Sequence, residues 1–549
     1  MRCASVRWRS SLARLATAAL LSVCGNGVAD GQTPNRIVWA HMMANMPSNA
    51  SMQYGATHPI NVYKGDYLSQ DTDLNATLRR ELVDAGVNGL AFEITARSNS
   101  SSPGVRHFIE FIKRFAHTSI PIAPCINVGN SPDDVINAIA HAYRASKTYG
   151  NAAIMRDGRL IVFLYQANNL TSSQWYRLRA ELAAANVKVF LAGDVSQLTL
   201  QVAQASGRAA AVVAPWDAAF NFNGTGLSDQ PHSNLAFGRA VTAEGRRWIG
   251  SVRPSYYRGV DVPLAWGPFG VDSAGTARLR SQWDQILQTT GAPWVYWSTL
   301  NDYVEHTNLL ADSNWGYTRS DLNAWYSSKF RETPYPFPPA LYLTTPQALH
   351  AGERSVAELL VINPSSVAIG ASLRLVASDG ALLGTARLSV PPHRHAALSL
   401  PVTAYGNTVR RYARAEAIGP VATIVSAPIL LGTEAKLPSD HSVPNYYSVN
   451  SRLRPPSNWH PVIKIDGKFV QVTGLDPTST GAVDLLVDGN LRDQILFPPA
   501  TPVLLRTDRI LKFSRDSNDN KASIRYGTKS TMIVRIVLRN GATWYSPPL

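Results

Sequence analysis

Apolar and polar positions follow two alternating patterns between residues 36 and 331. Short apolar runs predict β-strands over residues 36–41, 89–94, 121–127, 160–165, 188–192, 210–215, 247–252 and 294–299. Apolar residues at helical spacing predict helices over residues 74–85, 105–118, 132–147, 173–185, 235–244, 276–288 and 321–330. Strands that alternate with helices are typical of parallel βαβ units. Eight such units predict an α/β fold, a (β/α)8 TIM barrel over residues 35–332.

The pattern changes after a proline-rich linker at residues 333–340. Helical periodicity disappears, and alternating apolar runs appear between turn dipeptides such as Asp379-Gly380. This predicts an all-β, immunoglobulin-like sandwich over residues 341–437 and a second β domain over 440–549. Residues 533–538 and 543–545 are expected to form the last hairpin, with Asn540-Gly541 in its turn.

The N-terminus has the order of a secretory signal peptide. Four arginines between Arg2 and Arg14 precede an apolar run over residues 15–23, and small residues follow. We expect a signal peptide over residues 1–29 and a secreted, periplasmic or extracellular mature chain. Cys24 raises lipoprotein anchoring as a less favoured alternative, because bulky Val23 precedes it. The apolar run is too short to cross a bilayer, and no later segment is a candidate span.

Composition narrows the possible functions. The 549 residues include only three cysteines, two of them in the signal, so Cys125 alone remains and no internal disulfide is expected. The net charge of +14 includes the signal arginines, and no basic run with interleaved aromatic residues predicts nucleic-acid binding. A dispersed basic surface that associates with acidic envelope material is the favoured interpretation. No metal motif occurs, no cofactor is expected, and the sequence gives no oligomeric state.

Polar residues stand at or next to the predicted strand ends. In chain order these are His41, Glu93, Asn127, Gln166, Asp194, Asp217, Arg253 and Asp302. The carboxyl ends of barrel strands form the active-site rim, although any one of these residues could instead cap a turn or helix. Nearby aromatic rings suit stacking on sugars. We therefore expect substrate contacts from His41, Glu93, Asn127, Asp194, Trp216, Asp217, Arg253, Tyr256, Trp297, Asn301 and Tyr303.

Asp302 and Glu305 follow the last predicted barrel strand, three residues apart. Two carboxylates can divide the work of glycoside hydrolysis, one protonating the leaving oxygen and the other activating water or attacking carbon. Residues three apart share a face in a helical turn but not in an extended chain. The pair can serve one site only if the chain turns directly after the strand. The alternative is that Asp302 caps a turn and Glu305 is solvated.

The barrel half resembles glycoside hydrolase family 71, the α-1,3-glucanases. The opening strand over residues 37–43 is similar to the family's Val-Phe-Ala-His pattern, and residues 297–306 are similar to its Trp-Asn-Asp-Tyr/Trp-Gly-Glu-Ser motif. Residues 86–93 are similar to its second strand. The resemblance implies hydrolysis of an α-linked polysaccharide, most plausibly α-1,3-glucan, with inversion. It also implies that Glu305 is the general acid and Asp302 the base.

The chain departs from that family at several positions, and residues 94–101 offer no clear match for an acidic residue that the family carries after its second strand. Val304 replaces a glycine, His306 replaces a serine, and Glu93 stands where asparagine is usual. Two alternatives stay open: a non-catalytic carbohydrate-binding or envelope-associated protein on the same barrel, and an endo-α-mannosidase-type specificity. A general-acid role for Glu305 further predicts that its side chain is shielded from bulk water.

Overall fold

The computed structural model describes most of the chain after residue 35. The described residues are 36–43, 72–95, 103–116, 118, 120–149, 152–155, 157–195, 209–223, 233–257, 270–289, 291–303, 305–404, 411–433, 445–455, 461–466, 469–475, 479–487, 490–496, 511–514 and 531–549. The chain separates into two compact units, residues 1–36 and 37–549, and the elements below belong to the second. The expected signal peptide, with Cys24 and Ala29, lies outside the described residues, as does Val304.

Parallel strands form the predicted barrel. They are β1 (Ile37–Met42), β2 (Gly89–Thr95), β3 (Ile122–Asn127), β4 (Leu160–Tyr165), β5 (Val189–Asp194), β6 (Ala218–Phe220), β7 (Arg247–Trp248), β8 (Gly250–Val252) and β11 (Trp294–Trp297). Their order is β7-β6-β5-β4-β3-β2-β1-β11-β8. Only Ile249 separates β7, which pairs with β6, from β8, which pairs with β11. One chain segment therefore joins both ends of the sheet and completes the barrel.

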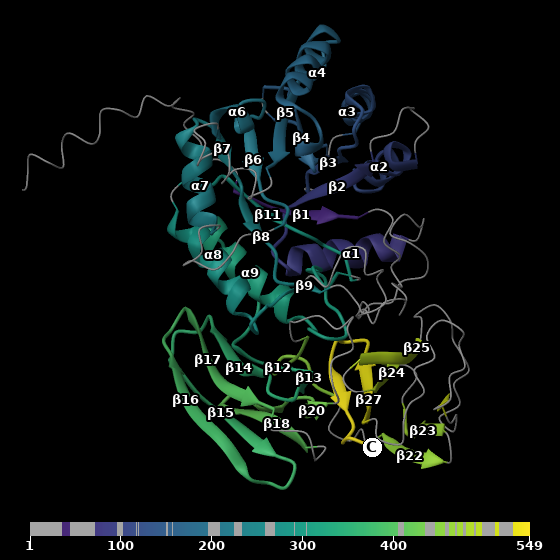
Figure 1. Ribbon diagram of the computed structural model, residues 1–549, viewed down its shortest axis with the longest axis vertical. Helices are drawn as coiled ribbons and strands as arrows, with labels where there is room; N and C mark the ends of the chain where they lie inside the picture. Colours follow the sequence, from purple (N-terminus) through teal and green to yellow (C-terminus); the bar gives the residue numbers. More distant parts are fainter. Residues whose placement is uncertain are drawn as a thin grey trace, which may run out of the picture. The chain divides into compact units, whose positions relative to one another are not determined.

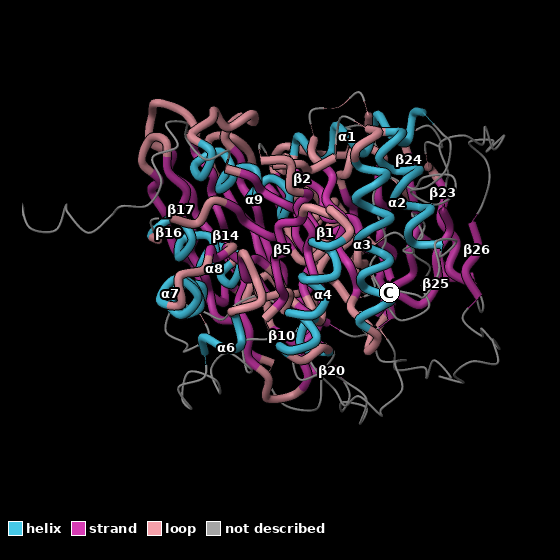
Figure 2. Tube along the Cα trace, turned by 90° about the horizontal axis from the view of Figure 1, so that it is seen from above, coloured by secondary structure: helices cyan, strands magenta, loops and turns pink. Residues whose placement is uncertain are grey.

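Helices cover the outside of the barrel sheet (Figures 1 and 2). They are α1 (Thr72–Asp84), α2 (Pro103–Arg114), α3 (Pro132–Ser146), η1 (Ala167–Asn169), α4 (Ser172–Ala184), α6 (Ala209–Val213), α7 (Asn234–Ala243), α8 (Ala277–Gln288) and α9 (Thr318–Arg331). Their apolar faces pack on the outward side chains of the strands, such as Phe92 against Phe111. The inward side chains form a separate core that includes Trp39, Phe163 and Tyr296. A small ribbon of β9 (Tyr256–Tyr257) and β10 (Gly270–Val271) follows β8.

The prediction of a strand over residues 210–215 is wrong. That run is helix α6, and the barrel strand is β6, which begins at Ala218. Three consecutive alanines favour helix, and a short apolar run does not distinguish a helix from a buried strand by periodicity. Pro215 then follows the helix, as is common at helix ends. The shift moves Trp216 and Asp217 from the expected carboxyl end of a strand to the amino end of β6.

Two sheets after the barrel form the predicted β-sandwich. Their strands are β12 (Ala340–Pro346), β13 (Ala348–His350), β14 (Arg354–Asn363), β15 (Ile369–Ala377), β16 (Leu382–Val390), β17 (Arg394–Thr403), β18 (Arg411–Ile418), β19 (Thr423–Val425), β20 (Ile429–Thr433) and β21 (Tyr446–Asn450). One sheet has the order β17-β14-β12-β21, and the other contains β13, β20, β18, β15, β16 and β19. Leu343, Leu359 and Leu373 belong to the core between them. Strand β21 pairs with β12 in the first sheet, although residues from 440 onward were expected in the second β domain.

The C-terminal strands form two further sheets around another core. They are β22 (Val462–Asp466), β23 (Phe469–Thr473), β24 (Thr480–Val487), β25 (Asn490–Leu496), β26 (Leu511–Ser514), β27 (Met532–Leu538) and β28 (Thr543–Tyr545). Val472, Leu485 and Ile536 pack together between the sheets. The predicted hairpin at the end of the chain is confirmed as β27 and β28. Gly541 in its turn has φ +88°, a conformation that favours glycine.

Candidate active site

Five of the predicted site residues meet at the carboxyl ends of the barrel strands. Alternate residues of a strand point to one face, and the inward positions of β1 to β5 include Trp39, Ala91, Cys125, Phe163 and Ala192. The inward side chains two positions further on close the barrel interior with polar groups. These are His41, Glu93, Asn127, Tyr165 and Asp194, and Arg253 takes the same position after β8. We call these six residues the polar ring.

Hydrogen bonds connect one side of the polar ring. His41 is buried, and its Nδ1 lies 2.7 Å from the Tyr296 hydroxyl while its Nε2 lies 3.4 Å from Glu93 Oε2. Asn127 Nδ2 donates to Glu93 Oε1 at 2.9 Å. Burial raises the pKa of Glu93, but the hydrogen bond and charge of His41, with the bond from Asn127, outweigh it and leave the pKa below its usual value. Glu93 is therefore held as a carboxylate between a histidine and an amide.

A second carboxylate of the polar ring, Asp194, is buried and held by the backbone. The amides of Gln166 and Phe222 donate to its two oxygens at 3.2 and 2.9 Å. Burial raises the pKa of Asp194 to about 6, although these bonds and the charge of Arg253 oppose the shift. Burial also raises the pKa of Tyr165 to about 12, and the charges of Asp194, Glu305 and Glu93 add to that rise. The charges of three carboxylates therefore act on Tyr165.

The chain turns directly after β11, as the Asp302–Glu305 pair requires. The Asp302 amide donates to Thr299 Oγ1 at 3.0 Å, and the Thr307 amide donates to the Asp302 carbonyl at 3.2 Å. The Glu305 amide donates to Asp302 Oδ1 at 2.9 Å, and only 2% of Asp302 is exposed. The Asp302 carboxylate thus stabilises the turn, as the alternative interpretation expected. The same turn places it beside the backbone of Glu305.

Glu305 faces the polar ring and is half-buried. The Tyr256 hydroxyl donates to Glu305 Oε1 at 2.9 Å, and the Arg253 guanidinium lies over the Tyr256 ring at 5.1 Å from its centroid. Burial lowers the pKa of Arg253 to about 10, and the charge of Glu305 opposes that shift. Glu305 is therefore partly shielded from solvent and held by Tyr256, and it is not an isolated surface group. It can reach an incoming ligand from the same side as the polar ring.

Three residues predicted to contact substrate are instead buried around the turn. Trp297, Asn301 and Tyr303 are each 0% exposed. Trp297 and Tyr303 pack in the core between sheet and helices, where the Trp297 indole donates to the Thr307 carbonyl at 3.3 Å. The Asn301 side chain bonds both the amide and the carbonyl of Met43 at 3.0 Å. These contacts attach the turn to the end of β1, so the three side chains support the site rather than line it.

Trp216 and Asp217 lie away from the candidate site. They were expected there because the predicted strand over residues 210–215 would have ended next to them, whereas in the structure they precede β6. Asp217 Oδ2 accepts from the Leu191 amide at 2.8 Å and pairs with Arg179 at 3.2 Å, at the amino end of β6. Trp216 is 4% exposed and packs edge-on against Trp175 of α4. Both residues stabilise the barrel at this end.

Two aromatic residues of the site, Tyr165 and Tyr296, were not predicted from the sequence. Gln166 was expected at the end of β4, but its side chain is exposed and its φ of +55° ends the strand. Tyr165, one position earlier, points inward and stacks near Phe222 at 4.2 Å between ring centroids. Counting two positions on from the inward apolar residue of each strand would have found it.

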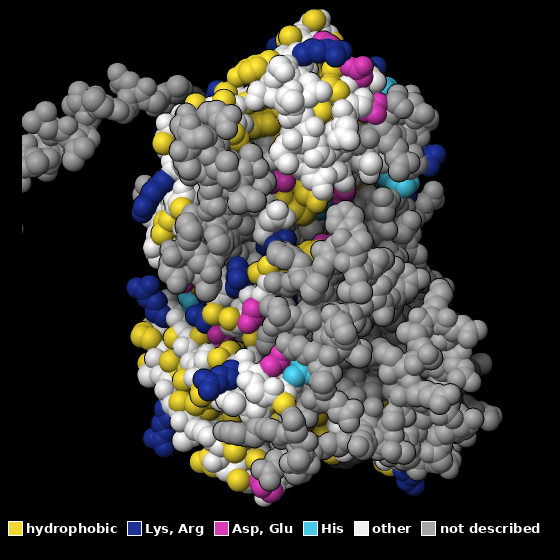
Figure 3. Space-filling view, viewed as in Figure 1, with side chains coloured by type: hydrophobic (Ala, Val, Ile, Leu, Met, Phe, Trp, Pro, Cys, Tyr) yellow, Lys and Arg dark blue, Asp and Glu magenta, His cyan; other side chains and the backbone are white. Residues whose placement is uncertain are grey.

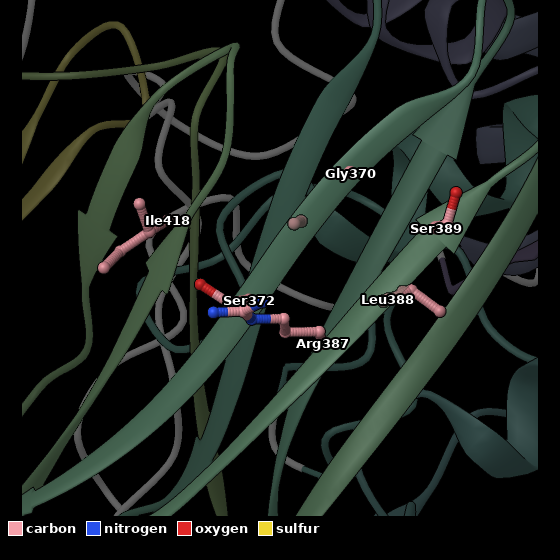
Figure 4. Close-up of a pocket in the computed structure, with 7 residues that line it drawn as sticks. Gly370, Ser372, Arg387, Leu388, Ser389 and Ile418 are labelled. Carbon is pink, nitrogen blue, oxygen red and sulfur yellow. The ribbon is translucent and has the colours of Figure 1, made fainter.

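Other features of the described residues do not suggest a second site. They contain no group of three or more His, Cys, Asp or Glu side chains that could hold a metal ion. None of their helices is both long and apolar enough to cross a membrane. Lys and Arg side chains are dispersed over the face in Figure 3. A shallow hollow on the sandwich is lined by Gly370, Ser372, Arg387, Ser389 and Ile418 among others, without a carboxylate or an aromatic ring (Figure 4).

The solved structures named below are remotely similar to the chain. No protein-family model and no curated protein matches the chain. Among solved structures it is similar to a glycosyl hydrolase family 2 member from Bacteroides cellulosilyticus (8% identity, TM-score 0.37, covering 94% of this chain and 61% of that one). It is also similar to a β-glycosidase from Bacteroides vulgatus (9% identity, TM-score 0.38, covering 94% and 64%). The chain spans less than two thirds of these proteins, and TM-scores in this range carry no conclusion about activity.

Proposed function

We propose that the protein is an exported glycoside hydrolase acting on an α-linked polysaccharide. The observation that carries this proposal is the turn after β11, which brings Glu305 to the carboxyl ends of the barrel strands beside Asp302 and the polar ring. Active sites of TIM-barrel enzymes lie at this end of the barrel. The similar structures named above are glycosidases, which agrees with the hydrolase part of the proposal without carrying it.

The proposed reaction is hydrolysis with inversion. Glu305 transfers its proton to the glycosidic oxygen as the bond from that oxygen to the anomeric carbon breaks. Asp302 accepts a proton from a water molecule whose oxygen forms the new bond to the anomeric carbon. One water is consumed, and the two carboxyl groups exchange their protonation states until solvent resets them. Glu93, Asn127 and His41 are proposed to bind sugar hydroxyls, because charged and amide groups at this rim suit such contacts.

The proposed substrate is α-1,3-glucan. It is supported by the resemblance of residues 37–43 and 297–306 to family 71 motifs, whereas Glu93 and His306 depart from that family. An endo-α-mannosidase-type specificity would use the same carboxylate pair. Assays on insoluble α-1,3-glucan beside other α-glucans and α-mannans separate the two specificities.

The test follows the anomer that forms first. The mature chain is incubated with α-1,3-glucan oligosaccharides, and the products are observed by proton NMR before mutarotation. Inversion of an α-linkage gives the β-anomer first. An α-anomer as first product would contradict the Asp302–Glu305 mechanism, and no product from any α-linked substrate would contradict the hydrolase.

A carbohydrate-binding protein without turnover is the second candidate. It is favoured by the tight hydrogen bonding of Asp302 within the turn and of Glu93 within the polar ring. Such a protein would retain polysaccharide in pull-down experiments, and Glu305→Gln would leave that retention unchanged. It would release no reducing ends.

A further inference from the structure

The C-terminal β domain contacts the segment that carries Glu305. Arg535 of β27 is 1% exposed, and its guanidinium lies within hydrogen-bond distance of three groups of residues 313–314. It donates to the Ser313 carbonyl at 3.0 Å, to Ser313 Oγ at 2.9 Å and to Asn314 Oδ1 at 2.5 Å. Its Nε donates to the carboxylate of Asp484 at 2.7 Å.

The contact between Arg535, Asp484 and residues 313–314 is buried, so its charges and hydrogen bonds must be satisfied within the protein. Arg535 is 1% and Asp484 0% exposed. Burial lowers the pKa of Arg535, but the charge and hydrogen bond of Asp484, together with the nearby Tyr545 and Tyr447, outweigh burial and leave the pKa above its usual value. A buried ion pair is costly unless its geometry and remaining hydrogen bonds are satisfied. Here Asp484 neutralises the guanidinium, and residues 313–314 accept three further hydrogen bonds from it. The ion pair therefore depends on the position of the barrel segment as well as on its own domain.

Further bonds run from that contact to the turn with Glu305. Asp312 accepts the amides of Asn314 and Trp315 at 2.7 Å and the side-chain amide of Asn308 at 2.6 Å. Arg319 donates to the carbonyls of Asn308 and His306 at 3.2 and 2.8 Å. His306 is the neighbour of Glu305. Residues 305–316 are thus held by buried polar contacts from both sides.

Apolar packing from the C-terminal domain reinforces the same segment. Ala311 packs with Ala482 and Val537, and the ring of Tyr317 lies against this cluster. Tyr317 also fills the space beside Gly541, where an added Cβ would collide with the ring. The hairpin of β27 and β28 therefore has close contacts with residues 311–317 besides those of Arg535.

We propose that the C-terminal β domain is part of the catalytic unit, with Arg535 as a positioning residue for Glu305. This inference rests on the proposed function only for its kinetic consequence. The β domain has a structural role in the barrel whether or not it also contacts polysaccharide. The guanidinium, rather than a positive charge alone, is needed because it contacts Asp484 and residues 313–314 at once.

Hydrogen exchange tests the proposal without reference to activity. Arg535→Lys keeps the charge beside Asp484 but cannot make all the contacts of the planar guanidinium, and Arg535→Met removes the charge. Exchange of the Leu309, Leu310 and Gly316 amides should accelerate at least tenfold in Arg535→Lys, while amides of β3 and β4 keep their rates. Arg374→Met serves as the control, because it breaks an exposed pair with Glu416 within the sandwich.

Each outcome decides the proposal. Equal exchange of residues 305–316 in the parent and both Arg535 variants would overturn it. If Arg535→Met unfolds throughout, Arg535→Lys decides alone, because it retains the charge pairing. If the parent hydrolyses α-glucan, the proposal further predicts a tenfold or greater loss of kcat with KM nearly unchanged in Arg535→Lys. Accelerated exchange in a chain without hydrolase activity would support the positioning role and contradict the proposed function instead.

Discussion

At the scale of single residues, Tyr256 is the side chain through which Glu305 is oriented. Its hydroxyl donates to Glu305 Oε1 at 2.9 Å, next to the buried Arg253. Tyr256→Phe removes this bond without changing ring size. Glu305 becomes a carboxylate as it gives up its proton, and a hydrogen bond to a charged group contributes about 1.5–3 kcal/mol, so we expect kcat to fall roughly tenfold or more. Tyr176→Phe on the exposed face of α4 is the matched control, and equal kcat in both variants would contradict the role.

His306 predicts a pH-dependent loss of stability. It is buried with φ +57°, and burial lowers its pKa to about 4 from 6.5. The native state then binds fewer protons than the unfolded state, so stability is lost as pH falls from about 6.5 to 4, by about 3 kcal/mol. His306→Asn removes the titration and tolerates the left-handed backbone. Urea unfolding at pH 7 and pH 4.5 should show a smaller difference in this variant than in the parent.

The control for this prediction has the same backbone conformation. His393 also has positive φ, at 55°, but is exposed. His393→Asn should keep the pH dependence of the parent. A parent-like pH dependence in His306→Asn would show that the buried imidazole does not contribute.

At the scale of elements, the sequence correctly predicted the secondary structure of long or strongly patterned segments. The prediction failed where a segment was short. Seven of the barrel strand positions and the final hairpin follow from apolar runs and turn residues. The exception, β6, has only three residues behind an alanine-rich helix, so its apolar pattern gave too little information. Because this strand was predicted too early in the chain, Trp216 and Asp217 were wrongly expected at the site. The turn after β11 that the Asp302–Glu305 pair requires is present, because Asp302 accepts the Glu305 amide.

The sequence could not distinguish side chains that line the site from side chains that support it. Trp297, Asn301 and Tyr303 stand in the same motif as Asp302 and Glu305, yet all three are buried against the end of β1 or the outer core. Which face a residue of a turn presents depends on tertiary contacts that no local pattern encodes. Within regular strands the polar residues expected at the strand ends do come together, as the contact between His41 and Glu93 shows.

At the scale of the whole molecule, buried charges connect the sandwich to the barrel. Glu358 of β14 is 1% exposed and accepts the Thr276 amide at 2.8 Å before α8, and it pairs with Arg280 at 2.7 Å. Asp321 of α9 pairs in the same way with Arg452 at 2.6 Å. The domains are therefore expected to unfold together in one transition.

Glu358→Gln tests this coupling. The substitution keeps the size of the side chain but leaves Arg280 without its buried partner, so we expect a loss of about 2–4 kcal/mol in the free energy of unfolding. Urea unfolding should keep a single transition at a lower midpoint. Glu416→Gln in the exposed pair with Arg374 should cost less than about 1 kcal/mol. An unchanged midpoint in Glu358→Gln would contradict the coupling.

The most direct test of the proposed hydrolase is reducing-end release from insoluble α-1,3-glucan by the parent, Asp302→Asn and Glu305→Gln. Asparagine at 302 can still accept the Glu305 amide, so the turn is retained while the base is lost. Glu110→Gln on α2 and Asp379→Asn in the exposed turn before β16 are the matched controls. We predict release by the parent and both controls, and a loss of at least a hundredfold in the two site variants. Parent-like release by either site variant would contradict the assignment of this carboxylate pair.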